Sequence, residues 1–173
     1  MFLSHWRQRP RILWVILVGA LIGVDQLTKT YFSNTIALSE AVVVTDWFNF
    51  VHTLNRGAAF SFLASADGWQ RPLLIGISIL VIVPITLVCM YKNMDPVERR
   101  VGGLVVAGGA SNLIDRIQTG AVVDFLDVHW RGMHWPAFNL ADSYIVCAVL
   151  VWILLFRNSV SAQEQSTKAK VQA

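Results

Sequence analysis

The chain has 173 residues, of which 55% are hydrophobic and only 14% are charged, whereas a soluble domain usually carries about 25% charged residues. The mean hydropathy is +0.53 and the net charge is +3, with the basic residues gathered near the ends of apolar segments. This composition excludes an ordinary soluble domain, favours a membrane protein of one domain, and argues against nucleic acid as a partner.

Four apolar segments have about the 20 residues that a helix needs to cross a bilayer. They cover residues 12–32, 72–91, 97–117 and 138–156. We therefore expect a mainly α-helical membrane protein in which residues 1–158 form a single integral-membrane domain. Residues 159–173 are polar and are expected to be a disordered cytoplasmic tail.

The segment between the first two apolar spans has the pattern of a small β-structure. Residues 41–44 and 47–54 are rich in β-branched and aromatic side chains, and a Thr-Asp pair between them indicates a turn, so both are expected to be short strands. Residues 55–57 read Asn-Arg-Gly, which is a turn or bulge signal. Residues 58–63 predict a further apolar strand or an interfacial segment.

The distribution of arginine and lysine predicts how the chain crosses the membrane. Basic residues precede the first span, lie between the second and third, and follow the fourth: Arg7, Arg9, Arg11, Lys92, Arg99, Arg100, Arg157, Lys168 and Lys170. By the positive-inside rule these regions are cytoplasmic, so both termini are expected inside and the loops 33–71 and 118–137 outside. The expected fold class is a four-transmembrane-helix bundle with a small extracytoplasmic β-structure. The N-terminus also resembles a signal peptide, but three further spans and no clear cleavage motif favour a retained anchor.

This orientation brings the unusual polar residues to one face of the membrane. The first span runs outward with Asp25 in its second half, and the third span ends at the same face with the polar stretch 112–116. The fourth span begins there with Asn139 and Asp142, and Asp124 lies in the preceding outer loop. Because an ionised carboxylate in a membrane segment is costly, such a gathering indicates a functional site.

Asp124 and Asp142 are the candidate catalytic residues. An extended segment would place Asp124 on the face opposite Asp127, and Asn139 and Asp142 are neighbours on one side of a helix. The loop is therefore expected to bring Asp124 over the start of the fourth span, opposite Asp142. Two close carboxylates share one proton, so one takes a proton from water while the other protonates the substrate, as in aspartic proteases. The alternative for Asp142 is a helix-terminal stabiliser.

Other polar residues have more ordinary interpretations. Lys29 follows Asp25 by four residues, so an ion pair is expected. Arg116 follows Asn112 by four residues. It either forms an ion pair or snorkels to the interface, or it is a donor that organises the carboxylates or grips a substrate carbonyl. Four glycines predict close helix packing in the third span: Gly102, Gly103, Gly108 and Gly109.

No metal site or disulfide framework is expected. His129 and His134, with Asp127 nearby, are five residues apart, a spacing that matches no same-face helical pair, and the H-E-x-x-H motif is absent. Cys89 and Cys147 lie in apolar segments without a C-x-x-C or Cys/His neighbourhood, so both are expected to be packing residues.

Five blocks of the sequence carry a resemblance to one family. They are residues 24–29 (Val-Asp-Gln-Leu-Thr-Lys), 55–60 (Asn-Arg-Gly-Ala-Ala-Phe), 108–116 (Gly-Gly-Ala-Ser-Asn-Leu-Ile-Asp-Arg), 122–125 (Val-Val-Asp-Phe) and 138–143 (Phe-Asn-Leu-Ala-Asp-Ser). In this order they resemble the lipoprotein signal peptidase family, also called signal peptidase II. Two departures are Thr28, where many members have serine, and Ser111, where glycine is common.

The resemblance implies a bacterial inner-membrane aspartic peptidase with four spanning helices and a small extracytoplasmic β-structure. Such enzymes need no cofactor and cut the signal peptide from a diacylglyceryl-modified prolipoprotein, immediately before the lipidated cysteine. The antibiotic globomycin blocks them. By this resemblance the residues fall into a catalytic pair (Asp124, Asp142), a substrate-binding group (Asn55, Gly57, Asn112, Arg116, Asn139) and a supporting group (Asp25, Lys29, Asp115).

Two other functions remain open from the residues alone. A small membrane transporter also carries polar residues within its spans, although here they gather at one face instead of tracing a path across the bilayer. A non-enzymatic assembly factor could use the same aspartates as structural ion-pair partners.

Overall fold

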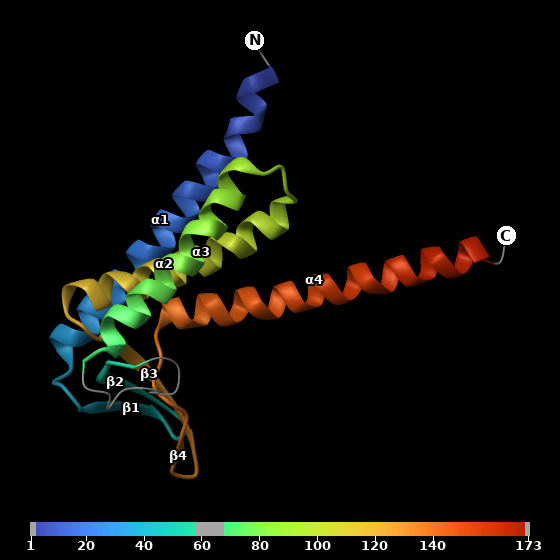
Figure 1. Cartoon of the computed structure of the whole chain (residues 1–173). Helices are drawn as coiled ribbons and strands as arrows, with labels where there is room; N and C mark the ends of the chain where they lie inside the picture. Colours follow the sequence, from blue (N-terminus) through green and yellow to red (C-terminus); the bar gives the residue numbers. More distant parts are fainter. Residues whose placement is uncertain (1–2, 58–67, 172–173) are drawn as a thin grey trace.

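The computed structural model describes residues 3–57 and 68–171 of the chain. Its elements are α1 (Leu3–Thr35), β1 (Ala41–Thr45), β2 (Phe48–Asn55), α2 (Gln70–Tyr91), α3 (Pro96–Gln118), β3 (Val122–Trp130), β4 (Met133–His134) and α4 (Leu140–Val171). Helices α1, α2 and α3 lie together, and the strands gather at one end of them (Figure 1). Helix α4 starts beside the strands and runs away from the other three helices.

Helix α3 is the central helix, because it packs against α1, α2 and α4. Its glycines allow this close approach, as the sequence predicts. A Cβ atom at Gly103 would collide with the indole of Trp14 on α1, and one at Gly108 would collide with the backbone carbonyl of Ala141 on α4. The polar residues of α3 are therefore held close to the start of α4.

Both ends of α3 are capped by side chains. At the start, Asp95 Oδ1 accepts a 2.7 Å hydrogen bond from the Val97 N–H, and a proline occupies the first turn, where its missing N–H costs nothing. At the other end, Arg71 from the first turn of α2 donates 2.9 Å hydrogen bonds to the carbonyls of Arg116 and Ile117. The last turn of α3 is thus tied to the start of α2.

The four strands form one antiparallel sheet in the order β1-β2-β3-β4. Asp124 of β3 pairs with Thr53 of β2. Aromatic stacking holds the sheet against the end of α1. The ring centroid of Phe32 lies 4.5 Å from that of Phe50 and 4.6 Å from that of Phe125. The strands expected over 41–44 and 47–54 are confirmed, whereas the segment expected over 58–63 lies outside the described residues.

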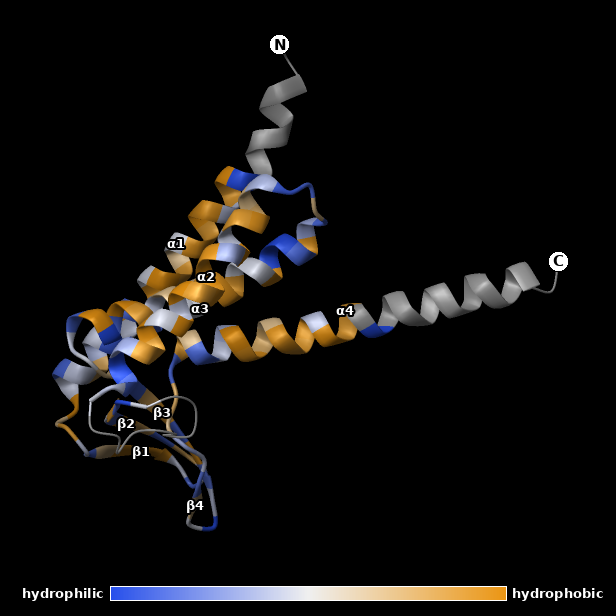
Figure 2. Cartoon of the chain, viewed as in Figure 1, coloured by the Kyte–Doolittle hydropathy of each residue, from blue (hydrophilic) through white to orange (hydrophobic). Residues whose placement is uncertain are grey.

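Hydrophobic residues predominate along α1, α2 and the first part of α4 (Figure 2), and many large hydrophobic side chains of these helices are exposed. Among the described residues, two helical segments are long and apolar enough to cross a membrane, 11–35 of α1 and 70–91 of α2. The apolar part of α4, 140–155, is shorter, and the glycines and polar residues of α3 lower the mean hydropathy of that helix. The expected bundle of four spans is therefore not confirmed, but the mainly helical fold with a small antiparallel sheet is.

Helix α4 continues to Val171 and so includes most of the predicted tail; this stretch contains Ala, Gln, Glu and Lys, which are strong helix formers. One further expectation needs correction. Both cysteines are free. Cys89 is a buried packing residue, as expected, but Cys147 on α4 is exposed.

Candidate active site

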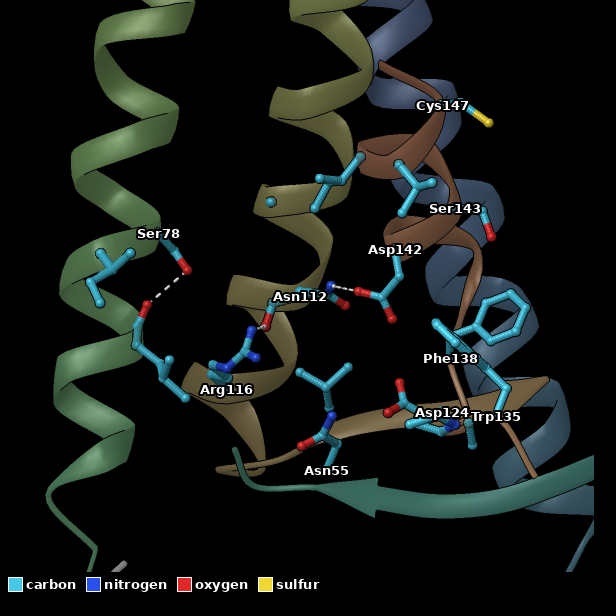
Figure 3. Close-up of a pocket in the computed structure, with 18 residues that line it drawn as sticks. Asn55, Ser78, Asn112, Arg116, Asp124, Trp135, Phe138, Asp142, Ser143 and Cys147 are labelled. Carbon is cyan, nitrogen blue, oxygen red and sulfur yellow. Dashed lines mark hydrogen bonds between the residues drawn. The ribbon is translucent and has the colours of Figure 1, made fainter. Parts of the chain in front are cut away.

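A cavity of about 680 Å³ lies where the sheet meets the helices. Asn55 at the end of β2, Asn112 and Arg116 on α3, Asp124 on β3 and Asp142 on α4 all line it (Figure 3). The side chains of Asp124 and Asp142 enter this space from different elements. The rest of the wall is mostly apolar and comes largely from α2 and α4.

Asp142 lies in the first turn of α4 and caps the start of this helix together with Asn139. Its backbone N–H donates to Asn139 Oδ1 at 3.0 Å, and its Oδ2 accepts from the Asn139 N–H at 3.3 Å. Its other oxygen, Oδ1, accepts a 2.8 Å hydrogen bond from Asn112 Nδ2. The expectation that Asp142 stabilises the helix end is thus confirmed, and its carboxylate also faces the cavity.

Asp124 is only 2% exposed. Its Oδ1 accepts a 2.7 Å hydrogen bond from Asn139 Nδ2. Burial, and then the nearby charge of Asp142, raise the pKa of Asp124 to about 7, although hydrogen bonds from Asn139 and Asn55 and the charge of Lys29 oppose the shift. Asp124 therefore holds a proton at a pH where an exposed aspartate is ionised.

Two asparagines connect the two carboxyl groups. Asn139 donates to Asp124, and its Nδ2 also lies 3.3 Å from Asn112 Oδ1. Asn112 in turn donates to Asp142. The structure thus brings together the two aspartates and two asparagines that the sequence places in one site.

An ion cluster lies behind these asparagines. Lys29 Nζ lies 2.7 Å from Asp25 Oδ2 and 2.8 Å from Asp115 Oδ2, and it donates to Asn112 Oδ1 at 2.8 Å. The ion pair expected between Lys29 and Asp25 is confirmed, and Asp115 extends it. Asp25 and Lys29 are at most 3% exposed, so the cluster supports Asn112 from inside the protein.

Arg116 and Gly57 meet at the edge of the cavity. Arg116 donates through Nη2 to the Gly57 carbonyl at 3.1 Å and through Nη1 to the Asn112 carbonyl at 3.3 Å. The Gly57 N–H donates to Asn55 Oδ1 at 2.9 Å. Arg116 is therefore bonded to backbone carbonyls, while its charge acts on the aspartates across the cavity.

The histidines of the sheet lie outside this cavity. His134 Nδ1 is 2.9 Å from both carboxylate oxygens of Asp127, which also accepts from Asn49 Nδ2 at 2.8 Å. The ring of His129 stacks on that of His134. Within the described part of the chain, no group of three or more His, Cys, Asp or Glu residues is arranged to hold a metal ion.

Three polar residues near the site are not predicted by the sequence. Gln26 and Ser111 bond to the ion cluster, and Arg71 caps α3. Gln26 and Ser111 fall within blocks 24–29 and 108–116 of the resemblance, and Gln26 directly follows Asp25, but neither observation indicates a role for their side chains. Ser111 gave no signal beyond its small size, and the partners of Arg71 lie about 45 residues along the chain.

Comparisons with known proteins match the chain to one family. The family model described as signal peptidase (SPase) II matches residues 17–157. The lipoprotein signal peptidase of Serratia marcescens is 40% identical over 152 residues, covering 88% of this chain and 87% of that protein. The lipoprotein signal peptidase of Tolumonas auensis is 44% identical over 144 residues, covering 82% of this chain and 87% of its own length.

A solved structure has the same fold. A bacterial membrane enzyme superposes with a TM-score of 0.76 at 25% sequence identity, covering 87% of this chain and 90% of its own. A second structure of a bacterial membrane enzyme gives a TM-score of 0.72. The extent of the family match favours a peptidase over the transporter and the assembly factor. The chain therefore belongs to the signal peptidase II family of peptidases.

Proposed function

We propose that the protein is a membrane aspartic endopeptidase that removes the signal peptide from diacylglyceryl-modified prolipoproteins. The cut falls immediately before the lipidated cysteine. The observation that carries this proposal is the convergence of Asp124 and Asp142, through Asn139 and Asn112, on one cavity. Membership of the family supports the substrate class.

The surroundings of the two carboxyl groups favour different protonation states. Asp142 accepts two N–H donors, from Asn112 and from the Asn139 backbone, and lies at a helix start, where the helix dipole favours an anion. Asp124 is buried, and its pKa is raised to about 7. We therefore assign the resting proton to Asp124 and the negative charge to Asp142.

These assignments give each carboxyl group a role in hydrolysis. Asp142 takes a proton from water as the water oxygen attacks the carbonyl carbon, and Asp124 gives its proton to the carbonyl oxygen. The resulting diol collapses when Asp142 passes the proton to the leaving nitrogen and the C–N bond breaks. Asp124 recovers a proton from the diol, so the products are a carboxylic acid and an amine and both aspartates return to their starting states.

The polar residues around the dyad are assigned to binding and support. The proposed substrate-binding group is Asn55, Gly57, Asn112, Arg116 and Asn139, and the proposed supporting group is Asp25, Lys29 and Asp115. The first group supplies amide, backbone and guanidinium donors at the cavity wall for an extended peptide. The second group holds the first from behind through Lys29 and Asn112. Inhibitors of the globomycin type are proposed to occupy the same cavity.

A bilayer is the setting that fits this substrate. Each buried CH₂ of a lipid anchor contributes about 0.8 kcal/mol to membrane attachment, so the enzyme has to meet its substrate at the interface. We propose that residues 1–158 form one integral-membrane domain with four spans in the bacterial inner membrane. Both termini are then cytoplasmic, and the dyad lies at the outer leaflet among membrane lipids.

The proposal is tested with purified protein and a lipid-modified prolipoprotein, whose cleavage is followed by gel shift. Asp124→Asn and Asp142→Asn should each abolish cleavage while the protein stays folded, and EDTA should leave the wild-type activity unchanged. Asp127→Asn is the matched control, because Asp127 is a buried aspartate of the same strand that bonds to Asn49 and His134, outside the cavity. Full turnover by either dyad variant rejects the mechanism.

A further inference from the structure

Two polar residues lie beside the dyad, namely Gln26 on α1, which is partly buried, and Ser111 on α3. Ser111 is completely buried, and its Oγ donates a 2.7 Å hydrogen bond to Asp25 Oδ2. Gln26 Nε2 donates to Ser111 Oγ at 3.0 Å and to Asp115 Oδ1 at 2.7 Å. Neither residue lines the cavity, so a direct contact with substrate does not explain them.

The orientation of these hydrogen bonds is determined by their partners. Three acceptors face the Gln26 amide, namely the Asp115 carboxylate and the hydroxyl and carbonyl oxygens of Ser111. Only the NH₂ end of the amide suits such a set, because the carbonyl end would repel the carboxylate. Since Gln26 donates to the serine oxygen, the single O–H of Ser111 is directed to Asp25. The bonds therefore run in one direction, from Gln26 through Ser111 to Asp25.

The ion cluster needs these neutral donors because its charges do not balance. Asp25 and Asp115 share one cation, Lys29. A buried carboxylate without enough hydrogen-bond partners is costly. Lys29 cannot supply a further donor, because its three ammonium protons are directed at Asp25, Asp115 and Asn112. Ser111 supplies the further donor for Asp25, and Gln26 supplies it for Asp115.

Asp25 connects this cluster to the dyad. Its Oδ1 accepts a 2.9 Å hydrogen bond from the backbone N–H of Ala141, the residue directly before Asp142. Without the Ser111 hydroxyl, Asp25 Oδ2 keeps Lys29 as a partner but loses a donor, so the carboxylate is less firmly held. A shift of Asp25 would be passed to Ala141 and, through Lys29, to Asn112, which is bonded to Asp142.

We propose that Gln26 and Ser111 are positioning residues of this peptidase, which hold Asp25 and Asp115 so that Lys29, Asn112 and the start of α4 keep Asp142 in its catalytic orientation. This inference rests on the proposed function, because it assumes that Asp142 acts on the scissile bond. The contact on which the pair acts is the hydrogen bond from Asn112 to Asp142, so we expect the pair to affect the chemical step rather than substrate affinity.

Ser111→Ala tests the proposal. We expect kcat to fall on the order of tenfold, because a hydrogen bond to a charged group is lost, while KM and the folded fraction stay at the wild-type values. The matched control is Thr30→Ala, which removes an exposed hydroxyl of α1 that donates to the Gln26 backbone carbonyl, and which should leave kcat unchanged. Unaltered kcat in Ser111→Ala, or a loss explained by KM or by unfolding, overturns the proposal.

Gln26 provides a second and independent test. Gln26→Glu has nearly the same shape but presents a carboxylate to Asp115, so it should lower kcat more than Gln26→Ala does; equal or higher activity of the Glu variant contradicts a donor role. The double variant Gln26→Ala/Ser111→Ala should be at least as slow as the slower single variant, because Gln26 supports Asp115 and Ser111 supports Asp25. A double variant faster than either single variant contradicts this arrangement. Loss of cleavage in Asp124→Asn together with unaltered kcat in Ser111→Ala would reject this inference alone and leave the proposed function intact.

Discussion

Asn139 and Asp142 form a reciprocal pair across the first turn of α4: the Asp142 N–H donates to Asn139 Oδ1 at 3.0 Å, and the Asn139 N–H donates to Asp142 Oδ2 at 3.3 Å. This arrangement is a capping box, in which each residue satisfies a free N–H group of the helix start. The same carboxylate faces the cavity. The Asp142 side chain thus caps the start of α4 and is also proposed to activate water.

The double role of Asp142 predicts different results for two substitutions. Asp142→Asn keeps an oxygen that accepts from the Asn139 N–H, so the protein should lose cleavage but keep its stability. Asp142→Ala loses the acceptor as well, and its unfolding free energy should fall by about 1 kcal/mol, the usual value of a cap. Thermal unfolding in detergent and the gel-shift assay separate the two effects. Equal melting temperatures for the two variants would contradict the capping role.

The pH dependence of cleavage follows from Asp124. Because its pKa is raised to about 7 and its protonated form is the proposed acid, activity should decline as the pH rises above about 7. The decline should approach tenfold in kcat/KM for each pH unit. The measurement is a pH profile of kcat/KM in a fixed concentration of detergent at constant ionic strength. A rate that stays constant up to pH 9 argues against Asp124 as the proton donor.

The stability of the protein should depend on Asp124 in the opposite sense from an ordinary ion-paired aspartate. The unfolded chain releases this proton near the ordinary pKa of 3.8, whereas the folded protein keeps it until about pH 7. The folded state therefore binds more protons between these values, and its stability falls as the pH rises through this window. Asp124→Asn removes the effect.

Compared with the wild type, Asp124→Asn should therefore gain stability at pH 8 relative to pH 5. Of the range from pH 5 to pH 8, the two pH units below about 7 fall in this window. The variant should therefore gain up to about 3 kcal/mol in unfolding free energy relative to the wild type. Thermal unfolding of both proteins at the two pH values measures the difference. The same offset at both pH values would show that Asp124 carries no such shift.

The contact of α3 with α4 makes a further prediction. A Cβ atom at Gly108 would collide with the backbone carbonyl of Ala141, which cannot rotate away as a side chain can. Gly108→Ala should therefore push α4 away from α3, lower the unfolding free energy by about 1–3 kcal/mol and displace Asp142. Gly76→Ala on α2 is the control, because its added Cβ would meet no atom of the described residues within 4 Å beyond its own stretch of helix. Loss of activity in both variants would point to a general effect of removing glycine.

The helices and the site could be predicted from the sequence because their signals are local. Hydropathy gave the extent of α2 closely, and the positions of Asp25, Asn112, Asn139 and Asp142 near span ends indicated that they meet. The four-span arrangement stays a proposal, since the many glycines and polar residues of α3 that make it a good central helix also lower its hydropathy.

The bonds of Gln26 and Ser111 could not be predicted in the same way. They join residues more than 80 positions apart, and the sequence does not indicate which residues the two side chains meet. Ser111 has the small size that helix packing alone demands, so its hydroxyl appears important only once Asp25 is seen beside it. Polar networks between helices are properties of the packing, which single-sequence patterns do not record.

The different burial of the two thiols has a practical consequence. Cys89 is buried, with its Sγ packed against Gly102 of α3. Cys147 is exposed and lines the cavity that holds the proposed dyad. A maleimide fluorophore should therefore attach to the wild-type chain at one place, close to where a peptide or an antibiotic would sit. Occupancy of the enzyme could then be followed by fluorescence, without engineering a reporter site and without waiting for turnover.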